Sequence, residues 1–179
     1  MGQEHAAALK GNPMCRLLSD AETAEIAYLM EQRNVRAREL LYRDGDVSEG
    51  LYLVVSGDFE LFKKGAKRER ELARLGPGAV FGAISVITRA MRTATARARV
   101  DSCVLLLPAE KFQVLVRAGS PAALKLAAGI AEVLAQRLAD TNAKLVELAD
   151  QVEAAQSAPS KERDRQFLEL QRALQVLSF

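Results

Sequence analysis

The chain has 179 residues, of which 49% are hydrophobic and 27% are charged, and its formal net charge is +2. This length suits one compact domain with an appendage, and the small net charge points away from nucleic acid or an anionic membrane as partner. Two cysteines and one histidine make neither a disulfide framework nor a spaced set of metal ligands. No nucleophile–histidine set or Walker loop is present either, so we expect no metal, no cofactor and no enzymatic activity.

The N-terminus lacks an apolar signal core, and no apolar run is long enough to span a bilayer, so we expect a cytoplasmic protein without a membrane partner. Residues 1–16 contain Gly11-Asn12-Pro13 and predict a mobile or loosely docked arm. Ser19 precedes Glu22 by three residues, which is capping-box spacing, and predicts a helix over residues 20–32.

Short strands separated by turn residues are predicted over residues 40–107. Asp44-Gly45-Asp46, Ser56-Gly57-Asp58 and Lys63-Lys64-Gly65 end successive apolar runs. Many short strands with regular turns favour a small antiparallel β-barrel or roll. The expected strands are 40–42, 51–55, 59–62, 68–75, 93–100, with Ala94, Ala96 and Ala98 on one face, and 104–107.

Two further helices are expected after the strands, a short one over residues 109–117 and a long one over residues 121–156 that has proline in its first turn. The long helix carries an apolar repeat with steps of four and three, which describes a coiled-coil seam. Thr141 is its one polar member and either sets register between two chains or contacts a ligand. The repeat consists of Ala127, Ala131, Leu134, Leu138, Thr141, Leu145, Leu148 and Val152.

Residues 157–179 begin with Ser157-Ala158-Pro159-Ser160, which breaks the long helix, and continue with an apolar stripe at helical spacing. This stripe predicts a linker and an amphipathic C-terminal helix. Three roles stay open for this segment: it docks on the roll, it binds a partner protein, or it is a frayed tail.

The residues that indicate a binding site for an anion lie in the segment from Gly76 to Arg99. Gly82 allows backbone N–H groups to approach an anion, and Arg92 offers a planar fork of donors with the Thr93 hydroxyl beside it. Ser85 either donates to a phosphate oxygen or caps a short helix. Phe81, Ile84 and Ile87 are expected in the core, whereas Arg89, Arg97 and Arg99 are expected to be solvated.

This segment resembles the phosphate-binding cassette of the cyclic-nucleotide-binding domains found in catabolite activator proteins and in protein kinase A regulatory subunits. Phe81-Gly82, Ile84-Ser85-Val86-Ile87 and Arg92-Thr93-Ala94-Thr95 carry the likeness. It extends from Leu17 to about Leu148, where Gly45 and Gly57 match glycines of the family. The resemblance implies an α+β fold: an antiparallel β-roll (a jelly-roll-like double-stranded β-helix) over residues 17–120, with short flanking helices and a long C-terminal helix.

One position departs from the family pattern. Ala83 stands where the family has a glutamate that accepts a hydrogen bond from the ribose 2′-hydroxyl. The resemblance implies that cyclic AMP or cyclic GMP would lie with its phosphate on Gly82, Ser85, Arg92 and Thr93 and its base on Thr141 and Asn142. Phe81, Ala83 and Ile84 complete the expected ligand-binding residues. A missing acceptor costs about 1–3 kcal/mol, or about tenfold to a hundredfold in affinity.

Two functions follow from these features. The first is a non-enzymatic sensor that binds a cyclic nucleotide, weakened by Ala83, and signals to a partner protein through the long or the C-terminal helix. The second is an adaptor that recognises a protein without any nucleotide. Either would be a homodimer if the seam pairs two copies. The winged helix-turn-helix of the catabolite activator proteins is larger than the tail after Pro159, so we expect no DNA binding.

Overall fold

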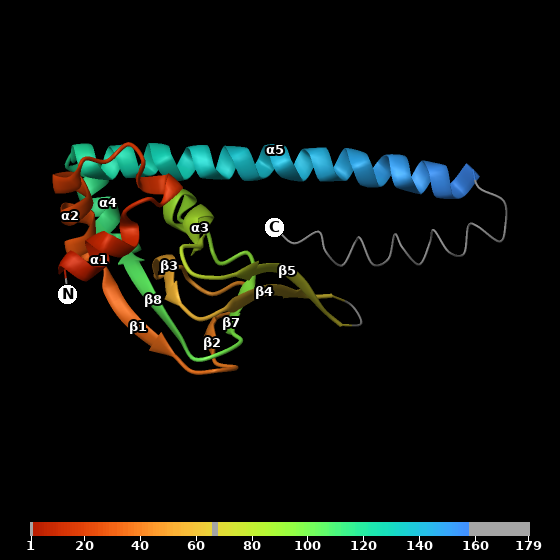
Figure 1. The fold of residues 1–179 in the computed structure, drawn as a ribbon, viewed down its shortest axis with the longest axis horizontal. Coiled ribbons are helices and arrows are strands. Elements are labelled where there is room, and N and C mark those ends of the chain that lie inside the picture. The colour runs from red at the N-terminus through yellow and green to blue at the C-terminus, as the bar shows by residue number, and fades with distance from the viewer. Residues whose placement is uncertain (1, 66–67, 158–179) are drawn as a thin grey trace.

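The computed structural model describes residues 2–65 and 68–157. The predicted C-terminal helix lies outside the described residues. An antiparallel β-roll forms the body of the protein, short helices gather at one end of it, and a long helix runs across one side and far beyond it (Figure 1). This is the α+β roll with a long C-terminal helix that the sequence predicts.

Two four-stranded antiparallel sheets make up the roll, in the orders β1-β8-β3-β6 and β2-β7-β4-β5. Alternating residues of β3 and β8 point into the roll, where Tyr52, Val54 and Leu106 pack with Phe59 and Phe81. The strands are β1 (Glu31–Val35), β2 (Leu40–Tyr42), β3 (Gly50–Ser56), β4 (Phe59–Lys64), β5 (Glu69–Leu75), β6 (Val80–Phe81), β7 (Thr95–Ala98) and β8 (Ser102–Pro108).

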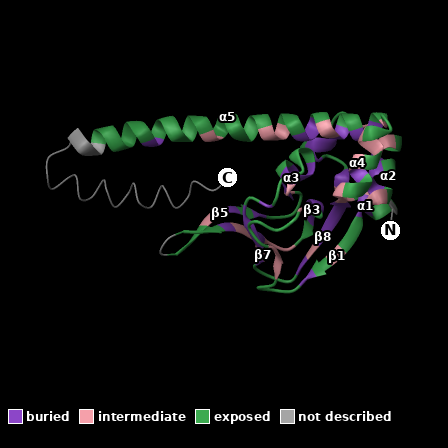
Figure 2. Ribbon diagram, turned by 180° about the vertical axis from the view of Figure 1, so that it is seen from behind, coloured by how far each residue is buried: buried purple, intermediate pink, exposed green. Residues whose placement is uncertain are grey.

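A second core lies between the roll and the helices. Ile26, Phe112 and Leu126 are buried there against the other faces of β3 and β8. The helical elements are α1 (Gly2–Leu9), the 3₁₀ turn η1 (Pro13–Cys15), α2 (Asp20–Leu29), α3 (Ala83–Thr88), α4 (Ala109–Arg117) and α5 (Pro121–Ser157). Buried residues of α5 are concentrated in its first turns, and most of its remaining length is exposed (Figure 2).

The expectation of a mobile or loosely docked arm over residues 1–16 is wrong. This segment folds into α1 and η1, and Leu9 and Met14 are fully buried in the helical core. The Asn12 side chain accepts a hydrogen bond from the Met14 N–H at 3.2 Å and donates one to the Gly78 carbonyl at 2.8 Å. Asn12 therefore both caps η1 and ties it to the roll.

Two strands, β1 and β6, were not expected from the sequence. The predicted helix 20–32 ends at Leu29 because Glu31–Val35 forms β1 and pairs with β8. The two-residue strand β6 pairs with Tyr52 and Leu53 of β3. The other expected strands and the helix over 109–117 are present, with shifts of a few residues at some ends.

The length and hydropathy of the described helices bear on membrane insertion. No single one combines the length and hydropathy needed to cross a bilayer. The segments 109–117 and 121–154 satisfy those limits only when taken together, across a bend of 116°.

Candidate functional site

A cavity of about 420 Å³ lies between the roll and α5. Eight of the nine residues that the sequence singles out line it, because the β6–α3 segment, the loop between α3 and β7, and α5 converge there. The ninth, Asn142, is exposed and is not among the lining residues. The lining residues are Tyr42, Leu61, Leu72, Phe81, Gly82, Ala83, Ile84, Ser85, Arg92, Thr93, Ala94, Leu134, Arg137, Leu138 and Thr141.

Arg92 is the buried cation of this cavity, with 3% of its surface exposed. Its Nη2 donates to the Gly50 carbonyl at 2.7 Å and its Nη1 donates to the Gly82 carbonyl at 3.4 Å. Its Nε has no hydrogen-bond partner in the described part of the chain. A buried guanidinium held by neutral carbonyls, with one N–H group unsatisfied, favours an anion as its further partner.

Aromatic rings support the Arg92 guanidinium. Its Cζ lies 4.2 Å from the centre of the Tyr42 ring and 5.2 Å from that of Tyr52. Burial raises the pKa of both phenols, so both rings stay neutral at physiological pH. The stack continues from Tyr52 to Phe81, whose ring centres are 5.3 Å apart. The predicted core position of Phe81 is confirmed.

Gly82 makes room for Arg92. Its φ is 76°, in the left-handed region, and a Cβ atom there would lie 2.3 Å from Arg92 Nη1 and 3.0 Å from the Gly50 carbonyl oxygen. Glycine therefore meets two requirements at once, a backbone conformation and a close approach of the arginine. The structure gives Gly82 no side-chain cap at the start of α3.

The three hydroxyl groups of the predicted site lie around the cavity. Ser85 Oγ donates to the Met91 carbonyl at 3.3 Å, so the structure shows it tying the ends of the loop together. Thr141 Oγ1 donates to the Arg137 carbonyl at 2.7 Å within α5, and Thr93 is exposed. Each hydroxyl oxygen keeps lone pairs that can accept from a ligand.

Two residues that were predicted to lie in the core are exposed in the structure. Ile84 and Ile87 are 46% and 39% exposed, because they lie on the outer side of the short helix α3. Ile84 instead lines the cavity. By contrast, Ala83 is buried, as are Ser85 and Val86 on the inner side.

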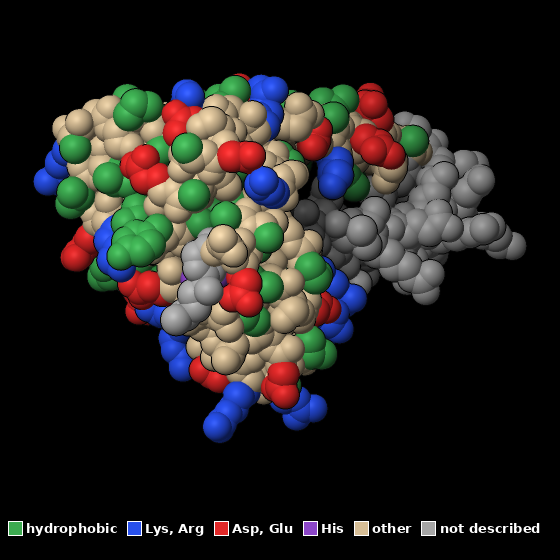
Figure 3. Space-filling view, turned by 60° about the vertical axis from the view of Figure 1, so that its left-hand side comes forward, with side chains coloured by type: hydrophobic (Ala, Val, Ile, Leu, Met, Phe, Trp, Pro, Cys, Tyr) green, Lys and Arg blue, Asp and Glu red, His purple; other side chains and the backbone are tan. Residues whose placement is uncertain are grey.

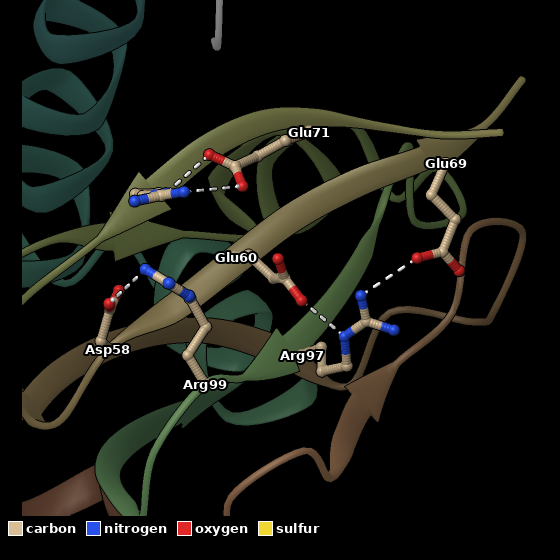
Figure 4. A network of polar contacts seen from close by, with 7 residues as sticks. Asp58, Glu60, Glu69, Glu71, Arg97 and Arg99 are labelled. Atoms are coloured by element: carbon tan, nitrogen blue, oxygen red, sulfur yellow. Dashed lines mark hydrogen bonds and ion pairs between the residues drawn. The ribbon is translucent and has the colours of Figure 1, made fainter. Parts of the chain in front are cut away.

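The other arginines near this segment have partners elsewhere. Over β4, β5 and β7, Arg97 pairs with Glu60 at 2.5 Å and with Glu69 at 3.0 Å, and Arg99 pairs with Asp58 at 3.0 Å (Figure 4). Arg89 donates to the Gln113 side chain at 2.8 Å. The expectation that these residues are simply solvated is therefore too simple, and Arg92 differs from Arg97 and Arg99 in having no acidic partner among the described residues.

Arg137 and Tyr42 are site residues that the sequence reasoning missed. Arg137 lies one helical turn before Thr141 on α5, lines the cavity, and donates from Nη2 to the Val80 carbonyl at 3.2 Å. Its i, i+4 spacing from Thr141 places both on one helix face and could have indicated the cavity role. Tyr42 gave no such signal, because its contact with Arg92 joins two strands that are distant in sequence.

Metal chemistry finds no support in the described residues, which contain no group of three or more His, Cys, Asp or Glu side chains placed to hold an ion. The site is instead an apolar cavity with arginines at its edge. A mostly apolar cavity with a few converging polar groups is typical of small-ligand sites. Residues 32–118 match the family model of the cyclic nucleotide-binding domain, so this part of the chain is a domain of that family.

Known proteins resemble the chain over most of its length. The cyclic AMP receptor protein of Thermus thermophilus is 34% identical over 139 residues, which are 76% of this chain and 62% of that protein. The crystal structure of the Thermus thermophilus catabolite activator protein has a TM-score of 0.68 at 31% identity, and the match covers 78% of this chain and 64% of that one.

A more distant structure shares the fold. The regulatory domain of Toxoplasma gondii protein kinase A, solved with cyclic AMP, has a TM-score of 0.64 at 17% identity, over 78% of this chain and 50% of that one. The chain thus spans less than two thirds of the length of these three relatives.

Proposed function

We propose that the chain is a non-enzymatic regulatory module that binds cyclic AMP or cyclic GMP in the cavity and passes the signal to a partner protein. The proposal includes a weakened affinity, because Ala83 provides no acceptor for the ribose. It also includes a cytoplasmic location and a homodimer formed through α5. The similarity to the cyclic AMP receptor protein of Thermus thermophilus supports the nucleotide class.

The burial of Arg92 carries this proposal. Removing a guanidinium from water is costly, and two carbonyl oxygens and two aromatic faces offset the cost only in part. A phosphate oxygen that accepts from Arg92 would supply a charge-assisted hydrogen bond in a site of low dielectric. An anion therefore gains more here than beside an exposed arginine such as Arg117.

The position of the cavity suggests how binding becomes a signal. Its lining comes both from the roll and from Leu134, Arg137, Leu138 and Thr141 of α5. A ligand that touches both would favour one placement of the distal part of α5 over others. The exposed surface of α5 beyond the cavity would then present a changed face to a partner.

Isothermal titration with cyclic AMP, cyclic GMP and cyclic di-GMP in separate runs tests the proposal. We expect binding of cyclic AMP or cyclic GMP that Arg92→Ala abolishes and Arg89→Ala retains, since Arg89 contacts Gln113 outside the cavity. Unchanged affinity in Arg92→Ala would overturn the site assignment. Silence for all three ligands would favour the adaptor, and the search would move to proteins that bind α5 regardless of nucleotide.

A further inference from the structure

We propose that the cavity prefers a phosphate monoester carrying two negative charges, such as a nucleoside 5′-monophosphate, over a singly charged cyclic phosphodiester. This inference rests on the proposed function, because it assumes that the cavity binds the phosphate of a nucleotide. It adds the charge class of the ligand.

Two arginines line the cavity. Arg92 donates to the Gly82 carbonyl and Arg137 to the Val80 carbonyl. These carbonyls are two residues apart in the chain, where β6 turns through the left-handed Gly82 into α3. Because each guanidinium is anchored on the same short segment, one phosphate group between them can contact both.

Neither arginine is paired with an acidic side chain in the described part of the chain. No aspartate or glutamate is among the residues that line the cavity, and the residue directly after the Gly82 carbonyl, at the start of α3, is the buried Ala83. Among the described residues, the lining of the cavity thus has two positive charges and no negative one.

The charge of the ligand decides which phosphate fits best. A monoanion leaves one of two positive charges uncompensated, whereas a dianion balances both. Arg92 is buried and Arg137 is exposed, so the second charge of a dianion can remain in contact with water while the first is desolvated. The remaining lining is mostly apolar and suits the body of a nucleoside. Its aliphatic members are Leu61, Leu72, Ile84, Leu134 and Leu138.

The test compares ligands that share adenosine and one phosphate. Titration at about pH 7.5 with 5′-AMP and with 3′,5′-cyclic AMP should give an affinity roughly fivefold or more higher for 5′-AMP. The methyl ester of 5′-AMP, an open-chain monoanion, should bind like cyclic AMP. Because the second ionisation of a phosphate monoester has a pKa of about 6, the advantage of 5′-AMP should vanish at about pH 5.

Variants separate the two arginines. Arg137→Gln should bring the 5′-AMP and cyclic AMP affinities within about twofold of each other, because it removes the second charge. Ala83→Glu should reverse the preference, because a carboxylate neutralises one arginine. Arg117→Gln removes an exposed arginine outside the cavity and should leave the ratio as it is.

The outcomes distinguish this inference from the proposed function. Equal or tighter binding of cyclic AMP, with Arg92→Ala losing both ligands, overturns the dianion preference and keeps the nucleotide site. An advantage of 5′-AMP that persists at low pH or survives Arg137→Gln overturns it as well, since charge is then not the reason. Absence of binding by every ligand overturns both.

Discussion

Gly82 and Arg92 depend on each other at the scale of single residues. The left-handed φ of Gly82 turns the chain from β6 into α3, and its missing side chain leaves space for Arg92 Nη1. Sequence reasoning identifies both residues, since the glycine and the arginine suit an anion site. It does not identify the steric reason, because that reason is a contact between side chain and backbone that exists only in the fold.

Replacement of Gly82 by alanine tests this dependence. Gly82→Ala should lower the free energy of unfolding by about 2–4 kcal/mol, from backbone strain plus displacement of Arg92. Gly78→Ala is the matched control, because Gly78 has a φ of 82° and nothing within 4 Å of its Cβ position, so about 1 kcal/mol is expected. Urea unfolding measures both. Equal losses in the two variants would show that Arg92 does not depend on Gly82.

Ala83 is the second residue-scale test. It lies between the main cavity and a smaller one of about 110 Å³, so a longer side chain has space on either side. Ala83→Glu should strengthen cyclic AMP binding about tenfold, because it supplies the missing acceptor for a ribose hydroxyl. Ala83→Gln is the control that adds bulk without charge. Isothermal titration that finds equal or weaker binding in Ala83→Glu would contradict this role.

Contacts between α2 and α5 fix the helical end of the molecule at the scale of elements. Ser19 and Glu22 form the predicted capping box, and Lys125 Nζ donates to the two Glu22 carboxylate oxygens at 2.7 and 2.9 Å. The Lys125 hydrogen bond and the Ser19 N–H lower the pKa of Glu22 from 4.5 to about 2. The charged form therefore stabilises the folded state.

This interaction predicts a pH dependence. Because the folded pKa is depressed, its stabilisation is present above about pH 4.5 and is lost as the pH falls towards about 2. Glu22→Gln keeps the capping box and removes the charge, so it should lower the thermal midpoint at neutral pH and match the parent protein near pH 2. Glu25→Gln removes a carboxylate from the same helix and is the control. A pH-independent difference for Glu22→Gln would refute this interpretation.

Elements with a clear local sequence pattern were predicted, and elements that depend on contacts between distant segments were not. Helices with caps and strands with alternating apolar residues were predicted, as the capping box of α2 and the alternation of β7 show. Strand β1 has the sequence Glu-Gln-Arg-Asn-Val, and only its last residue is buried, so the sequence has no strand pattern there. The segment forms a strand because it pairs with β8. The expectation of a loose N-terminal arm rests on the turn signal Gly11-Asn12-Pro13, and long-range burial of Leu9 and Met14 overrides that local signal.

At the scale of the whole molecule, the distribution of surface charge and of exposed apolar side chains indicates where another chain could bind. Acidic and basic side chains are interspersed over the face seen in Figure 3, which agrees with the small net charge. Of the predicted seam, Leu138, Leu145 and Val152 are exposed on α5, beyond the helical core. The seam remains a prediction. Its exposed residues are what a second copy of α5 would cover.

Self-association is the prediction at this scale. Leu145 is 53% exposed and lies outside the cavity, so Leu145→Asp should disrupt a dimer without altering the ligand site. The adjacent Lys144→Gln removes an exposed charge that is not part of the repeat and should have no effect. Sedimentation velocity measures the oligomeric state. A monomeric parent protein, or a dimer unaffected by Leu145→Asp, would exclude this seam.

The candidate site was predicted where its residues are neighbours in sequence and missed where the fold joins distant segments. The segment from Phe81 to Thr93 supplies most of the predicted lining, whereas Tyr42 and Arg137 enter from β2 and α5. The count of positive charges in the cavity depends on Arg137, so a sequence reading alone undercounts it.

The Arg92 Nε–H group offers the most direct test of the central claim, that a phosphate-bearing nucleotide binds on Arg92. This group is buried without a partner in the described part of the chain, so an incoming phosphate oxygen should change its environment more than that of any exposed arginine. Arginine side-chain NMR during nucleotide titration, with Arg92→Lys to assign the resonance, measures this. We predict a saturable downfield shift of the Arg92 Nε–H proton. Binding that leaves this resonance unmoved would contradict the site.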